Sequence, residues 1–175
     1  MSTATLDRPD AGDALSFDAV QAFLFAEARA LDDRDWDTWL TFYHPDCPFW
    51  MPTWDDEDQL TEDPANEMSL IYYPNRAGIE DRIFRIKTDR SSATSLPEPR
   101  TSHNISNIEI LKREGTRIDL RFNWFTLTYR YGDTDQHWGT SFYTLDTASG
   151  APLITSKTVV LKNDRIHHVI DVYHV

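Results

Sequence analysis

Apolar residues in the first part of the chain recur every three or four positions, which is the period of an amphipathic helix. The apolar positions of the first such stretch share one helical face: Phe17, Val20, Leu24, Ala28 and Leu31. With Ser16 as the N-cap, they predict a helix over residues 17–31. The same spacing predicts a shorter helix that begins near Asp35 and ends before Pro45, and a third helix over residues 78–87.

From Thr101 onward the apolar period changes to two, which predicts strands. The expected strands are residues 101–112, 117–131, 137–145, 153–161 and 165–174. Short turn signals such as Gly132-Asp133 and Asn163-Asp164 separate them, and such short connections favour antiparallel neighbours.

One of these strands shows an apparent change of face. Its apolar residues occupy even positions up to Trp124 and odd positions from Phe125. A slip of one residue is what a β-bulge produces, so a bulge that bends the sheet is predicted at this point. The chain is therefore predicted to be α+β, a cone-like, strongly curved antiparallel sheet with the N-terminal helices packed in its concavity. Residues 16–175 form one domain, and residues 1–15 are predicted to be a flexible tail.

The segment from residue 49 to residue 76 is rich in both aromatic and acidic side chains. An acidic run over residues 55–58 is followed by Tyr72, Tyr73 and Arg76. The segment is too polar for a core strand and too aromatic for a flexible linker. Rings and guanidinium groups among charges are typical of surfaces that face a partner. The simpler interpretation is an ordered surface loop that packs its own rings on the domain.

Composition and charge narrow the possible classes. The chain has 175 residues, 40% of them hydrophobic, which suits a single domain with its own core. Its net charge of −12 disfavours binding to nucleic acid or to an anionic membrane. No apolar run approaches the roughly 20 residues that cross a bilayer, and the first residues lack the apolar stretch of a secretory signal. The lone cysteine, Cys47, fits a reducing compartment, so a cytoplasmic location is expected.

The C-terminal residues suggest a metal site at first inspection. His167, Asp171 and His174 would supply two histidines and a carboxylate for non-haem iron if the tail were helical. The residues around them favour a strand, on which His167 and Asp171 point to one side and His174 to the other. The tail is therefore predicted to be a structural strand, and no metal ligand is assigned.

A pocket inside the cone is the second possible location for catalysis. Asp81 with His103, or His44 as a base, could perform acid–base chemistry there. No motif joins these residues, and the sequence has neither a Gly-rich phosphate loop nor a GxSxG nucleophile elbow. One cysteine cannot hold an iron–sulfur cluster. No catalytic or cofactor-binding residue is assigned, and a stand-alone lyase or isomerase with an acid–base pocket is the alternative function.

Six blocks in order along the chain carry a family pattern. They are LDDRDWDTWL (31–40), FWMPTWDDEDQLTEDP (49–64), SLIYYPNR (69–76), GIEDRIFRIKT (78–88), RTSHNISN (100–107) and VVLKND (159–164). Together they closely resemble the small (beta) subunit of aromatic-ring-hydroxylating dioxygenases, in the benzoate and toluate branch. The resemblance runs from about Phe17 to Val175.

The resemblance implies a cone similar to nuclear transport factor 2, in agreement with the curved sheet predicted above. It implies a non-catalytic, structural subunit that binds a large (alpha) subunit, with three of each in a hexamer. The Rieske 2Fe–2S cluster, the mononuclear Fe(II) and the substrate pocket are implied to lie in the large subunit. A separate reductase would pass electrons from NADH, and the assembly would add both atoms of O₂ to an aromatic acid to give a cis-dihydrodiol.

Tyr72, Tyr73 and Arg76 are the predicted contacts with a partner, because planar rings and a guanidinium make good anchors. The sequence does not separate benzoate, toluate, halobenzoate and anthranilate as substrates, since the pocket that selects among them is implied to lie on another chain. A binding module for some other protein is a third interpretation.

Overall fold

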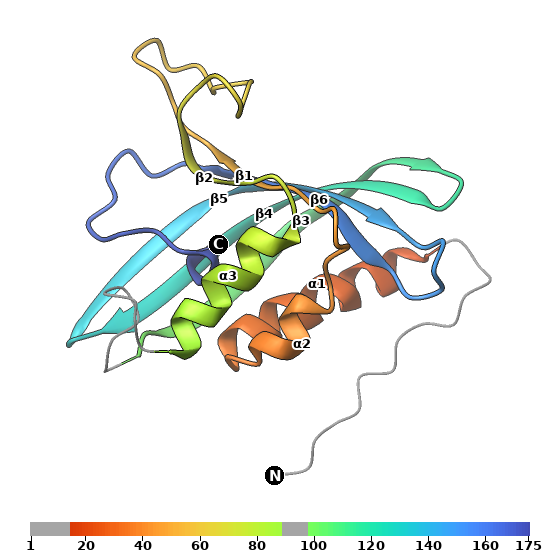
Figure 1. Ribbon diagram of the computed structural model, residues 1–175, viewed down its shortest axis with the longest axis horizontal. Coiled ribbons are helices and arrows are strands. Elements are labelled where there is room, and N and C mark those ends of the chain that lie inside the picture. The colour runs from red at the N-terminus through yellow and green to blue at the C-terminus, as the bar shows by residue number, and fades with distance from the viewer. Residues whose placement is uncertain (1–14, 89–97) are drawn as a thin grey trace.

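The helices lie on one face of a curved sheet (Figure 1). The structure is a computed structural model that describes residues 15–88 and 98–175. In these ranges α1 spans Phe17–Asp32, α2 spans Trp36–Leu40 and α3 spans Arg76–Lys87. The predicted cap is confirmed, since Ser16 Oγ accepts a hydrogen bond from the backbone N of Ala19 at 3.1 Å.

The described strands form one sheet with the order β2-β1-β6-β5-β4-β3. They are β1 (Phe49–Pro52), β2 (Ser69–Tyr73), β3 (Arg100–Glu114), β4 (Arg117–Arg130), β5 (Asp133–Asp146) and β6 (Leu153–Leu161). All neighbours are antiparallel except β1 and β6, which run parallel. The predicted α+β cone with a curved sheet is confirmed, and β6 has the bounds expected from the sequence.

Strands β1 and β2 correct the prediction that residues 49–76 form a surface loop. They pair with each other, and β1 also pairs with β6, so the short apolar ends of the segment extend the sheet. The polar residues between them, 53–68, form a loop that projects away from the sheet (Figure 1). Composition averaged over the whole segment hid two strands of four and five residues.

The predicted bulge at Trp124–Phe125 is wrong. Strand β4 pairs with β5 in one continuous register, and its even-numbered side chains stay buried from Ile118 to Thr128. The register shifts that involve β4 lie in its pairing with β3, where the φ angle of Asn107 is 51°. Along β4 the inner face becomes polar while the outer face becomes apolar, so the change in the pattern reports an apolar outer surface rather than a slip.

The predicted terminal strand over residues 165–174 is also wrong. The segment runs without strand pairing into a short 3-10 helix, η1 (Val172–His174). Asp171 caps η1, and its carboxylate receives the Arg82 guanidinium from α3. Val172 and Tyr173 are buried against the core. Residue types that favour strands are therefore buried here without pairing with the sheet.

A buried ion pair connects α1 to β6 in the middle of the core. Glu27 and Lys157 are 3% and 1% exposed, and Lys157 Nζ lies 3.3 Å from Glu27 Oε1. The same carboxylate oxygen accepts hydrogen bonds from Trp39 Nε1 at 2.8 Å and from Tyr43 Oη at 2.6 Å. Lys157 Nζ also lies 5.1 Å from the ring centroid of Phe49. Burial lowers the pKa of Lys157, against the opposing attraction of Glu27.

The ends of the chain add two observations. The tail predicted over residues 1–15 lies outside the described residues except for Leu15, which is buried. Among the described helices, none combines the length and the apolar character that a membrane span requires.

Candidate functional site

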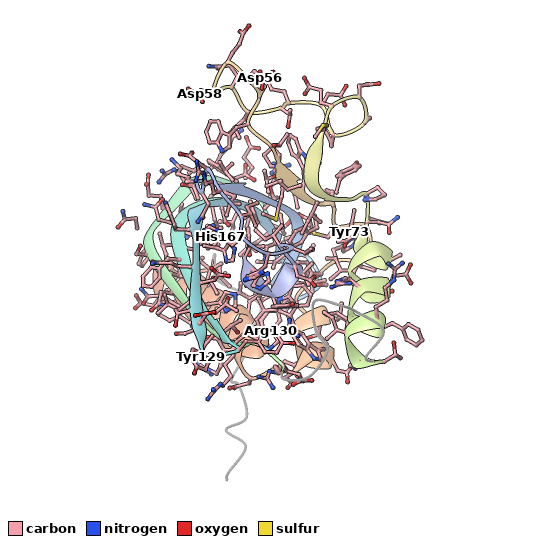
Figure 2. The ribbon with its side chains drawn as sticks, turned by 90° about the vertical axis from the view of Figure 1, so that its left-hand side faces the viewer. Asp56, Asp58, Tyr73, Tyr129, Arg130 and His167 are labelled. Atoms are coloured by element: carbon pink, nitrogen blue, oxygen red, sulfur yellow. The ribbon has the colours of Figure 1, made fainter. Side chains whose placement is uncertain are left out.

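The three predicted contact residues lie where β2 meets α3, and Figure 2 shows Tyr73 at this junction. The ring of Tyr72 is 38% exposed and lies on β2 opposite Trp50. Tyr73 is half-buried, and a Cβ on Gly78 would lie 2.4 Å from its ring. Arg76 Nε donates to Glu80 Oε1 at 2.7 Å, and its Nη1 donates to the Tyr43 carbonyl at 2.8 Å. Tyr73 and Arg76 therefore have contacts inside this chain, and contact of all three with a partner stays a prediction.

The acidic run lies in the projecting loop between β1 and β2. Figure 2 shows Asp56 and Asp58 at its outer end, away from the sheet. The loop is held by its own hydrogen bonds, since Asp55 Oδ1 accepts from the backbone N of Glu57 at 2.9 Å and of Gln59 at 2.8 Å. At its base, Trp54 Nε1 donates to the Leu161 carbonyl at 2.8 Å. The loop is therefore an ordered acidic surface that projects from the sheet.

The outer face of the sheet carries an aromatic surface that the sequence interpretation missed. We call it the outer aromatic face, and it comprises Phe125, Leu127, Tyr129, Trp138 and Phe142. Each of these side chains is between 38% and 45% exposed, and Phe125 lies directly opposite Trp138 in the β4–β5 register. Contiguous exposed apolar surface marks sites of protein association. The signal in the sequence was the run of odd apolar positions, which was attributed to a bulge.

The interior of the cone holds a histidine–aspartate pair that links β3 to α1. His103 Nδ1 lies 2.6 Å from Asp32 Oδ1, and the histidine side chain is 6% exposed. Burial raises the pKa of Asp32, but its hydrogen bonds with His103 outweigh this and lower the pKa overall. An ionised Asp32 accepts the hydrogen bond, so Nδ1 carries the proton and Nε2 faces the interior. The predicted partner of His103, Asp81, is exposed on α3. The predicted Asp81–His103 pair is therefore wrong, and Asp32 is the carboxylate that contacts His103.

The predicted base His44 is not part of this interior. It lies in the loop after α2, where its side chain is 41% exposed and its Nδ1 accepts a hydrogen bond from the backbone N of Asp46 at 3.2 Å. Of the three residues considered for an acid–base pocket, only His103 faces inward.

Inward-facing polar side chains from three neighbouring strands form a row beside this pair. His103 lies opposite Thr126, which in turn lies opposite His137. The ring of His174 from η1 packs 5.0 Å from that of His137, centroid to centroid. Burial lowers the pKa of His174 to about 3, and it also lowers that of His137, so both rings are neutral near pH 7. The His137 and His174 rings are therefore uncharged hydrogen-bonding groups in the interior that also holds the Asp32–His103 pair.

The three residues of the possible iron site do not come together. His167 is exposed on the loop after β6, whereas Asp171 is buried against Arg82. His174 accepts a hydrogen bond from the backbone N of Asp171 at 2.9 Å through Nδ1. Across residues 15–88 and 98–175, no group of three or more histidine, cysteine or acidic residues is placed to hold a metal ion.

Comparison with known proteins gives matches over nearly the whole chain. The family model for the ring hydroxylating beta subunit matches residues 26–168. The chain is 60% identical over 161 residues to toluate 1,2-dioxygenase subunit beta of Pseudomonas putida, which covers 92% of this chain and 99% of that protein. It is 56% identical over 163 residues to benzoate 1,2-dioxygenase subunit beta of Acinetobacter baylyi, covering 93% and 96%. The crystal structure of the benzoate 1,2-dioxygenase beta subunit from Burkholderia mallei superposes with a TM-score of 0.80 at 49% identity, covering 94% of this chain and 100% of that one.

The curved sheet and the helices on its inner face define an α+β cone of the nuclear transport factor 2 type. Within that class, the chain belongs to the ring hydroxylating beta subunit family. The resemblance drawn from the six sequence blocks is thereby confirmed.

Proposed function

We propose that this chain is the non-catalytic, structural small subunit of a multicomponent dioxygenase that cis-dihydroxylates benzoate or a related aromatic acid. The observation that carries the proposal is its 60% identity, over nearly its full length, to a protein named as the beta subunit of toluate 1,2-dioxygenase. The substrate is an aromatic acid, O₂ supplies both added oxygens, and the electrons come from NADH. The buried free thiol of Cys47 fits a cytoplasmic protein.

The proposed partner is a large subunit that holds the Rieske 2Fe–2S cluster, the mononuclear iron and the substrate pocket, in a hexamer of three large and three small subunits. A separate reductase delivers the electrons. Two surfaces of this chain support a role in assembly: the outer aromatic face, and the region around Tyr72 with the acidic loop. Aromatic anchors that lose water on association dominate the energetics of such interfaces.

Co-expression with a large subunit of the benzoate or toluate type tests the proposal. The two chains should co-purify as one assembly that contains iron and converts benzoate or a toluate when reductase and NADH are supplied. The 175-residue chain purified alone should contain no stoichiometric iron and should not oxygenate these acids. Iron bound at one equivalent in the isolated chain, or oxygenation by it, would contradict the proposal, as would failure to associate with any large subunit of this branch.

The Asp32–His103 pair keeps the alternative of a stand-alone lyase or isomerase open to a direct test. A histidine oriented by a carboxylate is the arrangement of a general base. If the chain were such an enzyme, replacing His103 with Gln would abolish a turnover measured without any partner. If the pair is structural, the same replacement lowers the stability of the chain and leaves the oxygenation activity of the whole assembly within about twofold.

A further inference from the structure

Five buried polar side-chain atoms in the described part of the chain have no hydrogen-bond partner, and all five belong to β3, β4 and β5. They are His103 Nε2, Trp124 Nε1, Thr126 Oγ1, Thr128 Oγ1 and His137 Nδ1. Trp124, Thr126 and Thr128 are successive inward positions of β4, and the two histidines lie opposite Thr126 on the neighbouring strands. A buried polar atom without a hydrogen bond has lost its water and gained no partner, which destabilises the fold. Such atoms gathered on one surface mark a place where a bound molecule supplies the missing partners.

A cavity of about 330 Å³ opens where this row reaches the end of the sheet. Its walls include Thr128 and His137, which are 6% and 5% exposed, so two of the unpartnered atoms belong to residues that line it. The C-terminal segment closes one side through Val169 and Tyr173. Arg130, which lines the cavity, lies at the end of β4, and Figure 2 shows His167 on the C-terminal segment above it. Cavities of roughly 300–1,000 Å³ accommodate small organic molecules.

The charges around the cavity disfavour an anionic ligand. Asp133 and Asp135 line it together with Arg130 and His168. Asp135 Oδ2 lies 3.4 Å from His168 Nε2, and the Arg130 guanidinium lies 4.7 Å from the centroid of the Tyr131 ring. Two carboxylates thus face one guanidinium at this rim, so a ligand carboxylate would meet more negative than positive charge.

The same walls suit a flat ligand with hydroxyl groups. The rings of Tyr131 and Tyr173 contribute aromatic surface to the cavity, on which another ring can stack. The Thr128 hydroxyl can both donate and accept a hydrogen bond. The neutral His137 ring has one nitrogen that donates a hydrogen bond and one that accepts. A hydroxyl on the ligand can therefore satisfy each of these groups without placing a charge in the interior.

We propose that this cavity binds a small uncharged aromatic alcohol, a phenol or a dihydroxybenzene, whose hydroxyl groups bond to Thr128 Oγ1 and His137 Nδ1. The ring lies between the aromatic and aliphatic walls, and its hydroxyl groups point toward β4 and β5. This binding activity is additional to the structural role proposed above, and it is a property of this chain alone.

Isothermal titration calorimetry of the full 175-residue chain with catechol, phenol and benzoate tests the proposal. Catechol should bind with saturation at one molecule per chain, and benzoate should bind at least tenfold more weakly. The change Thr128→Val keeps the shape of the side chain and removes the hydroxyl, so it should weaken catechol binding about fivefold, the equivalent of one hydrogen bond. The change Thr134→Val, at an exposed position of β5, is the matched control and should leave the affinity unchanged.

Unfolding of the ligand-free chain gives an independent measurement. If the Thr128 hydroxyl has no partner without a ligand, Thr128→Val should be at least as stable as the parent chain. If that variant does not fold, Val169→Trp at the rim, where Val169 is 72% exposed, replaces it and should weaken catechol binding by narrowing the mouth. The proposal is overturned by the absence of saturable catechol binding, by tighter binding of benzoate, by equal affinity in the variant used, or by a loss of stability in Thr128→Val. None of these results bears on association with a large subunit, which is measured separately.

Discussion

Removing the charge of Lys157 should destabilise this fold more than any exposed substitution, because it leaves the Glu27 carboxylate buried without a counter-ion. We expect Lys157→Met to lower the free energy of unfolding by about 3–5 kcal/mol, the cost of breaking a buried ion pair. The structure supports a value in this range, because Glu27 is 3% exposed and water cannot replace the lost ammonium. A domain of this size has about 5–15 kcal/mol of stability in total, so the variant should fold with a much lower urea midpoint.

A double-mutant cycle separates the ion pair from the loss of packing. Glu27→Gln keeps an oxygen that can accept the hydrogen bonds from Trp39 and Tyr43, which are 2.8 and 2.6 Å from the carboxylate in the parent chain. The double variant Glu27→Gln/Lys157→Met contains no buried charge at this place. Its loss of stability should therefore be smaller than the sum of the two single losses by at least about 2 kcal/mol.

The exposed pair Lys87–Asp37 is the matched control for this cycle. Lys87 Nζ lies only 2.5 Å from Asp37 Oδ1, but the Lys87 and Asp37 side chains are 41% and 83% exposed. The cycle with Lys87→Met and Asp37→Asn should give a coupling energy below about 0.5 kcal/mol. Both cycles are measured by urea unfolding at pH 7. A Lys157→Met variant as stable as the parent, or equal coupling energies in the two cycles, would refute the reasoning that burial makes the interior pair essential.

Three further predictions concern pH, assembly and packing. The pKa of His174 is about 3 in the folded chain and about 6.5 in the unfolded chain, so only the unfolded chain gains a proton there as the pH falls. The free energy of unfolding should therefore fall by about 2 kcal/mol between pH 6.5 and pH 5. His174→Asn should make the unfolding free energy depend less steeply on pH, and an unchanged slope would contradict this. Trp138→Glu should prevent co-purification with the large subunit and leave the stability of the isolated chain within about 0.5 kcal/mol, whereas Phe84→Glu, at a ring 63% exposed on α3, should assemble normally. Gly78→Ala should lower the free energy of unfolding by about 1–3 kcal/mol, because the new methyl group would overlap the Tyr73 side chain. Alanine normally stabilises an exposed helix relative to glycine, so an increase in the free energy of unfolding would argue against that contact.

The elements that local sequence specifies were predicted well. Helix α1 follows from its apolar period and from the cap at Ser16, both of which depend on residues within a few positions. Strand β6 has the predicted bounds because turn residues flank it and its own residues, such as Val159 and Val160, favour a strand. In both cases the information lies inside the element itself, so no distant contact is needed to recognise it.

The errors share the opposite cause, which is contact between residues far apart in the chain. The C-terminal segment has the composition of a strand, but the pairing of Asp171 with Arg82, 89 residues away, holds it outside the sheet. The carboxylate that meets His103 is Asp32, 71 residues away. Spacing along a sequence cannot reveal such pairs, because it describes faces of single elements and not which elements pack together.

The candidate site was predicted only in part for the same reason. The family followed from long blocks of sequence, while the outer aromatic face was present in the alternation of β4 but was interpreted as a bulge. Apolar residues at the odd-numbered positions of β4 have two explanations: a shift of register by one residue, or an apolar outer face beside a buried inner face. Only the continuous β4–β5 pairing separates them.

From Phe125 onward, the outer face of β4 exposes apolar side chains, among them aromatic rings, to solvent. A chain synthesised in excess of its large subunit would keep these rings uncovered, and such a surface promotes self-association. Production of the two polypeptides in matched amounts, with early association, would keep these rings covered, so the geometry of one strand bears on how its gene is expressed.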